Sequence, residues 1–381
     1  MPRLKLILFT LIRMTINIAH RMIYPFISTF ARALGVDVNT VTLLLANRSL
    51  FGALAPLVFP FIETRGRRFG MLLGLSLFVS AMSLTAFWPS LTTFGISLIL
   101  AVLGKAFFDP SMAAYLSDEI PYQRRGTALA ITEFGWSLSF IIGIPAMALL
   151  ISKFDWSTPF KILAVLGVLA LLFVFYNIRD VHMPEHHADG VLGNLRAILT
   201  SPSVLVALSI GLSASAANEL VNILFGVWLE DSFQLKIAAL AGASAVIGVS
   251  ELGGEGLVAL IADRLGKVRA VAIGLVLNCF ALALLPILGH TQIGALTGLF
   301  LFYLTFEFTM VSQISMMSEV MPLARATTLA FNGATQSLGR ALGALSTSAL
   351  YALGFSHVTF AAIGMNLLAL AAVWYVSRHH E

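Results

Sequence analysis

Charged side chains interrupt the long apolar stretches of this chain, and their chemistry gives the first indication of function. Five are basic and six are acidic: Arg13, Arg21, Arg48, Lys105, Arg340, Asp109, Glu133, Glu219, Glu251, Glu255 and Glu307. If these stretches cross a membrane, each charge near the bilayer centre costs at least about 2.5 kcal/mol, and such charges are normally paired or turned toward a polar cavity. A passive helix bundle gives no reason for so many, so we interpret them as a site for protons or polar solutes.

The spacing of these residues places them on shared helical faces. Lys105 and Asp109 are one helical turn apart and can pair with each other, and Glu251 and Glu255 have the same spacing. A carboxyl group in a low-dielectric setting can carry a proton, and an arginine can hold an anionic group. The candidate substrate- or proton-binding residues are Glu219, Glu307, Asp109, Asn218, Asn222, Arg48, Arg340, Arg13, Asn17, Arg21 and Lys105.

Each candidate also has a structural interpretation. Glu219 and Glu307 can be carboxyl groups that only hydrogen-bond between helices, and the Lys105–Asp109 pair can be purely structural. The arginines can neutralise a nearby acid instead of binding a solute. The remaining acids, Glu133, Glu251 and Glu255, fall toward the cytoplasmic halves of their segments, where gating or structural pairing is the favoured interpretation.

Composition shows which elements must position these residues. The chain is 58% hydrophobic and 11% charged, with a mean hydropathy of +0.91, whereas a soluble domain is about a quarter charged. Spanning helices need about 20 apolar residues each. We therefore predict an all-α integral membrane protein with twelve transmembrane helices over 6–31, 38–62, 70–88, 92–117, 127–151, 157–178, 203–229, 237–262, 270–288, 292–318, 327–351 and 357–377.

The chain repeats itself at an offset of 200 residues. Glu63-Thr64-Arg65-Gly66-Arg67-Arg68 aligns with the segment that begins at Asp263, so Gly66 falls on Gly266 and Arg67 on Lys267. The pattern Arg125-x-Thr127-x-Leu129-Ala130 also returns 200 residues later. These echoes predict two pseudo-symmetric six-helix bundles, 1–180 and 203–381, joined by a polar, His-rich linker over 181–202.

Charge distribution predicts the topology and a difference between the halves. Of the 23 Lys and Arg residues, fourteen fall on one set of loops, four on the opposite set and five within the spans. Because basic loops stay in the cytoplasm, both termini and the linker are expected there. The spans of the first half hold four bases and two acids, whereas those of the second hold one base and four acids.

The loop motif resembles that of the major facilitator superfamily of secondary transporters. The match is Asp263-Arg264-Leu265-Gly266-Lys267, and its first copy has Glu63 in place of Asp and Thr64 in place of Arg. The resemblance implies that these loops hold the cytoplasmic helix ends together and that the halves rock about a central site. The loop and gating residues so implied are Glu63, Gly66, Arg67, Arg68, Asp263, Arg264, Gly266, Lys267, Glu133, Glu251 and Glu255.

The expected function is proton-coupled export of a small amphipathic or drug-like compound across the cytoplasmic membrane by a monomer. No nucleotide-binding loop, catalytic triad, metal cluster or nucleic-acid patch is visible in the sequence, so no enzyme activity, cofactor or metal is expected. Gly135 and Gly143-Ile144-Pro145 lack the following glycine pair of proton-driven exporters, which leaves the direction open. The alternatives are proton-linked uptake of a small polar metabolite, lysolipid translocation, and a receptor or scaffold without transport.

Overall fold

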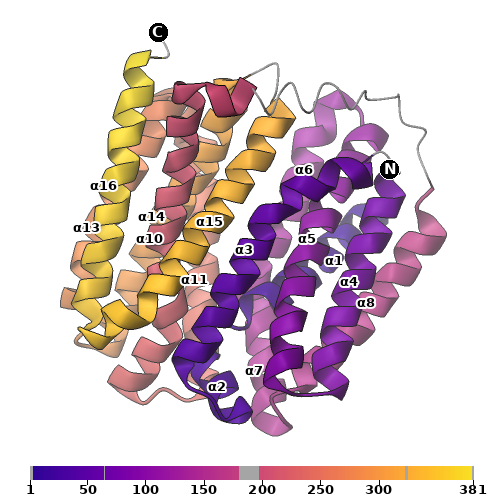
Figure 1. The fold of residues 1–381 in the computed structure, drawn as a ribbon, viewed down its shortest axis with the longest axis horizontal. Helices are drawn as coiled ribbons and strands as arrows, with labels where there is room; N and C mark the ends of the chain where they lie inside the picture. Colours follow the sequence, from indigo (N-terminus) through magenta and orange to yellow (C-terminus); the bar gives the residue numbers. More distant parts are fainter. Residues whose placement is uncertain (1–2, 64, 180–196, 322–324, 380–381) are drawn as a thin grey trace. The chain divides into compact units, whose positions relative to one another are not determined.

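The fold is built from helices joined by short turns (Figure 1). The computed structural model describes residues 3–63, 65–179, 197–321 and 325–379. These divide into two units: the described residues of Met1–His186 together with Ile237–Gly248, and the described residues of His187–Lys236 together with Val249–Glu381. Each of the twelve predicted spans corresponds to one helix or to consecutive helical segments, which confirms the all-α membrane fold.

The first unit holds the helices of the first six predicted spans. They are α1 (Arg3–Arg21), α2 (Ile27–Leu34), α3 (Val38–Glu63), α4 (Arg67–Phe87), α5 (Leu91–Glu119), α6 (Tyr122–Leu138), the π-helical turn η1 (Ser139–Gly143), α7 (Ile144–Lys153) and α8 (Thr158–Asn177). Within this unit α4 packs along α5 and α8, and α1 packs along α6.

The second unit repeats these pairings. Its elements are α10 (Pro202–Phe233), α11 (Ile237–Leu257), the π-helical turn η2 (Val258–Ala262), α12 (Asp263–Leu265), α13 (Lys267–Leu288), α14 (Gln292–Val320), α15 (Arg325–Ala352) and α16 (Phe355–His379), with the first half of α11 grouped with the other unit. Here α13 packs along α14 and α16, and α10 packs along α15. These are the pairings that the 200-residue repeat predicts, because α4 corresponds to α13 and α1 to α10.

The helices without central charges present apolar side chains outward. On α8, Leu169 and Phe175 are 58% and 49% exposed, and on α13, Phe280 and Ile287 are 63% and 65% exposed. Nine helices in the described parts of the chain are long and apolar enough to cross a membrane, or ten if the bent α2–α3 pair forms one span. Surfaces of this kind are stable against lipid and not against water.

The first predicted span is broken, although it was expected to run unbroken over 6–31. Residues 22–26 form turns between α1 and α2, and Pro25 explains the break because it has no N–H to donate to the Arg21 carbonyl. The Tyr24 amide donates to that carbonyl instead, at 3.3 Å. As a result Tyr24 does not donate to the carbonyl of His20, its usual helical partner.

A second irregularity lies in the predicted span over 127–151. The turn η1 separates α6 from α7 just before Pro145, whose missing N–H removes a helical hydrogen bond. A π turn accommodates an extra residue and rotates the side chains on either side of it relative to each other. Here Trp136 and Phe140, on α6 and η1, both face the Arg21 side chain of α1.

Candidate functional site

An ion network joins three spanning helices of the first unit. Arg13 of α1 lies 2.6 Å from Glu133 of α6 and 3.5 Å from Asp109 of α5. Lys105, one turn before Asp109 on α5, lies 2.7 Å from that carboxylate and donates a hydrogen bond of 2.5 Å to the side-chain oxygen of Asn17. The structure therefore brings these five predicted residues together, with two cations balanced by two acids.

Burial gives the members of this network different environments. The side chains of Arg13, Lys105 and Asp109 are 12%, 18% and 20% exposed, whereas that of Glu133 is 54% exposed. Asn17 is completely buried. Removing the Asp109 charge would leave two largely buried cations near a single acid, which is costly. Removing the Glu133 charge would also leave two cations with one acid, but the carboxylate that is lost is the more exposed of the two.

Arg21 lies beside this network and is held by aromatic rings. Its guanidinium carbon lies 3.5 Å from the centre of the Phe140 ring and 4.1 Å from that of Trp136, and it donates a hydrogen bond of 3.1 Å to the Trp136 carbonyl. The same indole has the Lys105 ammonium 5.4 Å from its ring centre. Trp136 thus links α6 to two cations through cation–π contacts.

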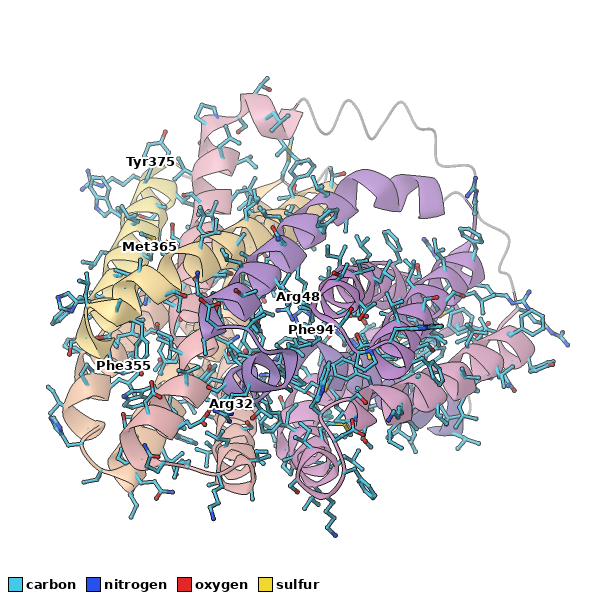
Figure 2. All side chains as sticks on the ribbon, turned by 60° about the horizontal axis from the view of Figure 1, so that its bottom comes forward. Arg32, Arg48, Phe94, Phe355, Met365 and Tyr375 are labelled. Atoms are coloured by element: carbon cyan, nitrogen blue, oxygen red, sulfur yellow. The ribbon has the colours of Figure 1, made fainter. Side chains whose placement is uncertain are left out.

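Arg48 of α3 spans the break between α1 and α2. It donates hydrogen bonds to the His20 carbonyl at 2.9 Å and to the Tyr24 hydroxyl at 2.5 Å, and it is 1% exposed. In Figure 2 the labelled Arg48 lies on the side of α3 that faces other helices. The carbonyl is available to Arg48 because Pro25 alters the hydrogen bonding of the preceding turn.

The second unit contains a mainly neutral polar stripe on α10. Asn222 accepts a hydrogen bond of 2.8 Å from the Tyr303 hydroxyl of α14. One and two turns earlier, Asn218 and Ser215 are 7% and 1% exposed, and their amide nitrogen and hydroxyl have no hydrogen-bond partner in the described parts of the chain. Glu219 is completely buried and faces α15, where a Cβ atom added at Gly343 would lie 2.9 Å from its Cβ.

Three other predicted glutamates gather where α11 meets α14. A Cβ atom added at Gly254 would lie 2.7 Å from the Leu304 carbonyl and 2.9 Å from the Cβ atom of Glu307. Glu255 follows Gly254 directly, and Glu251, which is 3% exposed, is one turn earlier. Glu307 thus lies on the side of α14 that faces α11, the helix that carries Glu251 and Glu255. Those two glutamates were predicted to act in gating. Arg340 lies apart on α15, partly exposed, with no ion pair among the described residues.

An amide cluster in the second unit was missed by sequence reasoning. Gln313 of α14 and Asn332 of α15 exchange two hydrogen bonds, of 2.7 and 3.1 Å, and Gln336 donates to Gln313 at 3.4 Å. Gln313 and Asn332 are buried, and Gly211 makes room for them on α10. Asn332 and Gln336 are four residues apart in an apolar segment, and that spacing was the available signal.

The two loop motifs have the same local structure. Gly66 and Gly266 have φ angles of +98° and +82°, a conformation open to glycine, and each precedes the first residue of a helix. Arg67 then pairs with Asp118 at 3.4 Å, and Lys267 pairs with Glu319. Each pair joins the start of one helix, α4 or α13, to the end of the next, α5 or α14.

Other loop residues contribute less to this geometry. Arg68 donates a hydrogen bond of 2.7 Å to the Phe175 carbonyl, and Arg264 is exposed. The side chains of Glu63 and Asp263, together with most of the predicted linker, lie outside the described residues.

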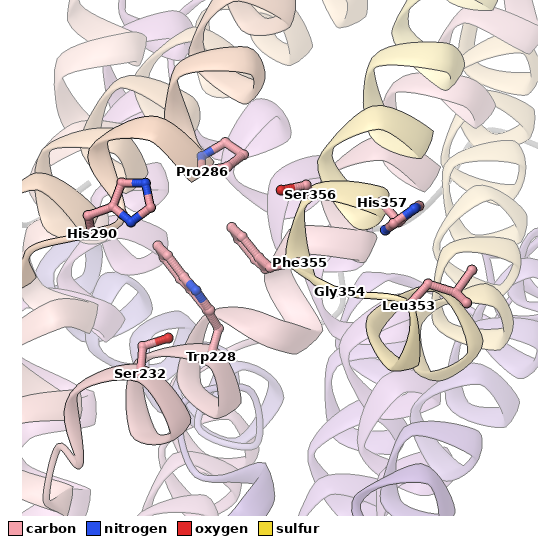
Figure 3. A pocket seen from close by; sticks show the side chains of 10 residues that line it. Trp228, Ser232, Pro286, His290, Leu353, Gly354, Phe355, Ser356 and His357 are labelled. Carbon is pink, nitrogen blue, oxygen red and sulfur yellow. The ribbon is translucent and has the colours of Figure 1, made fainter.

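A surface pocket of about 330 Å³ lies at the other end of the second unit (Figure 3). Trp228 and Phe355 stack in it with their ring centres 4.1 Å apart, and His290 and His357 lie on opposite sides of that stack. It contains none of the predicted site residues. Trp228 is 5% exposed and packs within its unit.

Comparisons with known proteins agree with this architecture. The model of the family described as Major Facilitator Superfamily matches residues 9–344. The uncharacterized MFS-type transporter YwfA of Bacillus subtilis (strain 168) is 24% identical over 93% of this chain and 86% of its own length. A probable sugar efflux transporter of Pasteurella multocida (strain Pm70) is 25% identical over 53% of this chain and 49% of its own length.

Solved structures show the same fold. A crystal structure of the peptide transporter POT in complex with sulfate superposes with a TM-score of 0.81 and 14% identity, covering 98% of this chain and 95% of the other. The ion network and the repeated glycine turns lie within the residues that the family model matches. The chain belongs to the Major Facilitator Superfamily of membrane transporters.

Proposed function

We propose that this protein is a proton-coupled secondary transporter of the cytoplasmic membrane that exports small amphipathic organic solutes by alternating access. The observation that carries the proposal is the network of Arg13, Lys105, Asp109 and Glu133 across three spanning helices of one unit. Intramembrane ion pairs are costly to bury and mark solute or proton pathways. Each pair can break and re-form, which a cycle of alternating access requires.

Glu219 and Glu307 are the proposed proton carriers. Glu219 is fully buried on α10, and Glu307 lies on α14 beside Glu251 and Glu255 of α11. Burial in a low-dielectric setting disfavours the charged form of a carboxyl group, so a proton can bind and leave as the surroundings change. The alternative role, interhelical hydrogen bonding alone, predicts that neutral glutamine replacements would keep coupled transport.

Export and orientation rest on separate arguments. The partial similarity to a probable sugar efflux transporter supports movement out of the cell, and the 28 phenylalanines and 13 methionines suit an amphipathic solute. The excess of basic residues on one set of loops supports cytoplasmic termini. We propose that the monomer is sufficient, because each predicted bundle provides its own set of polar residues.

A second candidate is proton-linked uptake of a small polar metabolite. The amide cluster of Gln313, Asn332 and Gln336 and the Asn222–Tyr303 bond supply neutral donors and acceptors of the kind that recognise hydroxyl or amide groups. Under the same inward proton gradient, uptake requires the proton and the solute to move together, whereas export requires them to move in exchange. A vesicle assay with a known internal pH distinguishes them.

Cysteine accessibility tests alternating access against a receptor or scaffold. Cys279 is the only cysteine, so replacing it with alanine gives a clean background. In that background Asn218→Cys and Ser215→Cys should react with a membrane-impermeant thiol reagent from either side of the membrane, in proportions that change with pH. Leu277→Cys is the control, because Leu277 lies on α13, is 47% exposed and is expected to face lipid. Reaction of both α10 cysteines from one side only, at every pH, would contradict alternating access.

A further inference from the structure

We propose that Arg48 binds an anionic group of the transported solute, so that the substrate is an amphipathic organic anion. The inference rests on the transport function proposed above and specifies the charge of its substrate. A carboxylate, sulfonate or phosphate group would meet the requirement, because each accepts hydrogen bonds from a guanidinium.

The surroundings of Arg48 leave its charge without an opposite partner. Its two hydrogen bonds go to a backbone carbonyl and to a phenol hydroxyl, both neutral, and the centre of the Tyr24 ring lies 5.2 Å from its guanidinium carbon. Its Nε–H is buried and has no hydrogen-bond partner among the described residues, and no carboxylate there forms an ion pair with it. The side chain is nevertheless 1% exposed.

A purely structural role does not require this charge. Arg48 links α3 to the broken segment between α1 and α2, but the His20 carbonyl and the Tyr24 hydroxyl could be satisfied by any neutral donor. A buried cation without a counter-charge is among the costliest features of a spanning segment. An anion that binds during the transport cycle would supply the counter-charge and accept the unused Nε–H.

The charge balance of the unit supports the same conclusion. Arg13 and Lys105 are matched by Asp109 and Glu133, two cations by two acids. The unit's predicted spans contain two further arginines and no further central acid, giving four bases against two acids. Arg21 directly follows His20, whose carbonyl Arg48 contacts, so an anion at the break between α1 and α2 would be near a second guanidinium. The rings of Trp136 and Phe140 lie against that guanidinium and provide apolar surface for the rest of a solute.

Binding of a matched pair of probes to the purified full-length protein tests the inference. The probes are 2-naphthoate and its uncharged isostere 2-naphthamide, with affinity measured from the shift in thermal unfolding at increasing probe concentration. We expect the unmodified protein to bind the carboxylate about tenfold more tightly than the amide. Arg48→Met should weaken naphthoate binding about 30-fold and leave naphthamide binding nearly unchanged.

Three further variants separate binding from structural support. Arg48→Lys keeps the charge and should retain part of the preference for naphthoate. Tyr24→Phe removes the hydroxyl that accepts from Arg48 and keeps the ring, so the preference for naphthoate should persist or increase. Arg378→Met is the matched control, because Arg378 also stacks on an aromatic ring, that of Trp374 at 4.1 Å, but lies at the end of α16. It should bind both probes as the unmodified protein does.

Two results would overturn the inference. One is equal binding of the two probes by the unmodified protein. The other is a preference for naphthoate that survives Arg48→Met. A preference that Tyr24→Phe abolishes as completely as Arg48→Met does would count in the same way, because it would indicate that Arg48 and Tyr24 only hold the helices together. Failure of the proposed transport function would look different, because gradient-driven movement would then be absent from vesicles even if naphthoate bound tightly.

Discussion

At the scale of single residues, the chemistry of this transporter depends on how buried charges are compensated. The first unit uses three solutions: ion pairs for Arg13 and Lys105, aromatic rings for Arg21, and neutral oxygen acceptors for Arg48. Ion pairs restrain helices but can break when one partner binds a proton. Neutral acceptors fix the side chain and leave its charge available to a ligand.

The network around Asp109 predicts a specific pattern of stability. Asp109→Asn should lower the free energy of unfolding by about 3 kcal/mol, because Arg13 and Lys105 then share a single acid. Adding Lys105→Met should recover most of the loss by removing the surplus cation. Thermal unfolding of the purified variants measures both effects.

Glu133→Gln is the control for this prediction. It leaves the same surplus cation, but its side chain is 54% exposed against 20% for Asp109, so its loss should lower the free energy of unfolding less than Asp109→Asn does. A double variant no more stable than Asp109→Asn alone would show that charge balance does not govern this network.

At the scale of helices and turns, irregular segments determine where these side chains point. Sequence patterning predicted the spans, the repeated loops and the Lys105–Asp109 pair, because these depend on hydropathy and on local spacing. It did not predict the break at residues 22–26, although Pro25 was visible, because proline in a spanning helix can also produce only a kink. It also missed the Gln313–Asn332 pair, because a contact between two helices has no local spacing.

The turn before α8 allows a prediction about pH. Asp155 accepts hydrogen bonds from the backbone amides of Ser157 and Thr158, at 2.6 and 3.0 Å, and from their hydroxyls. These bonds, chiefly that from the Ser157 hydroxyl, lower the pKa of Asp155 from 3.8 to about 2. Because the folded-state pKa is the lower one, the stabilisation is complete above pH 3.8 and is lost as the pH falls through about 2.

Asp155→Ala should therefore lower the free energy of unfolding by about 1 kcal/mol at neutral pH, the usual net contribution of a hydrogen bond. The difference from the unmodified protein should shrink as the pH falls below 3.8, as followed by chemical unfolding at a series of pH values. Asp155→Asn keeps an acceptor oxygen, so its free energy of unfolding should lie between those of the unmodified protein and Asp155→Ala. A difference that stayed constant down to the lowest pH would contradict this account of the turn.

At the scale of the whole molecule, the two units share helix pairings and loop geometry but differ in charge. The glycine turns at Gly66 and Gly266, and the ion pairs of Arg67 and Lys267, are near copies at the 200-residue offset. The central residues do not repeat: cations predominate in the spans of the first half and acids in those of the second. The repeat could be predicted from the sequence because both copies of each motif have the same or similar residue types at the same spacing. The roles of the central residues were not, because they depend on contacts among helices.

This difference leads to the central proposal, in which the acids of the second unit carry protons while cations of the first contact the solute. Glu219→Gln with Glu307→Gln removes both proposed proton sites and replaces each with a side chain of similar size. The double variant should still exchange solute across vesicles when no gradient is present, because exchange needs alternating access but no net proton movement. Thermal unfolding close to that of the unmodified protein would confirm that its fold is intact.

The most direct measurement is accumulation of a solute against its concentration gradient in proteoliposomes with an imposed pH difference. The solute would be one that stabilises the purified protein in a binding screen. The account predicts accumulation by the unmodified protein, none by the Glu219→Gln, Glu307→Gln double variant, and equal exchange by both without a gradient. Undiminished accumulation by the double variant would contradict the assignment of proton coupling to these two residues.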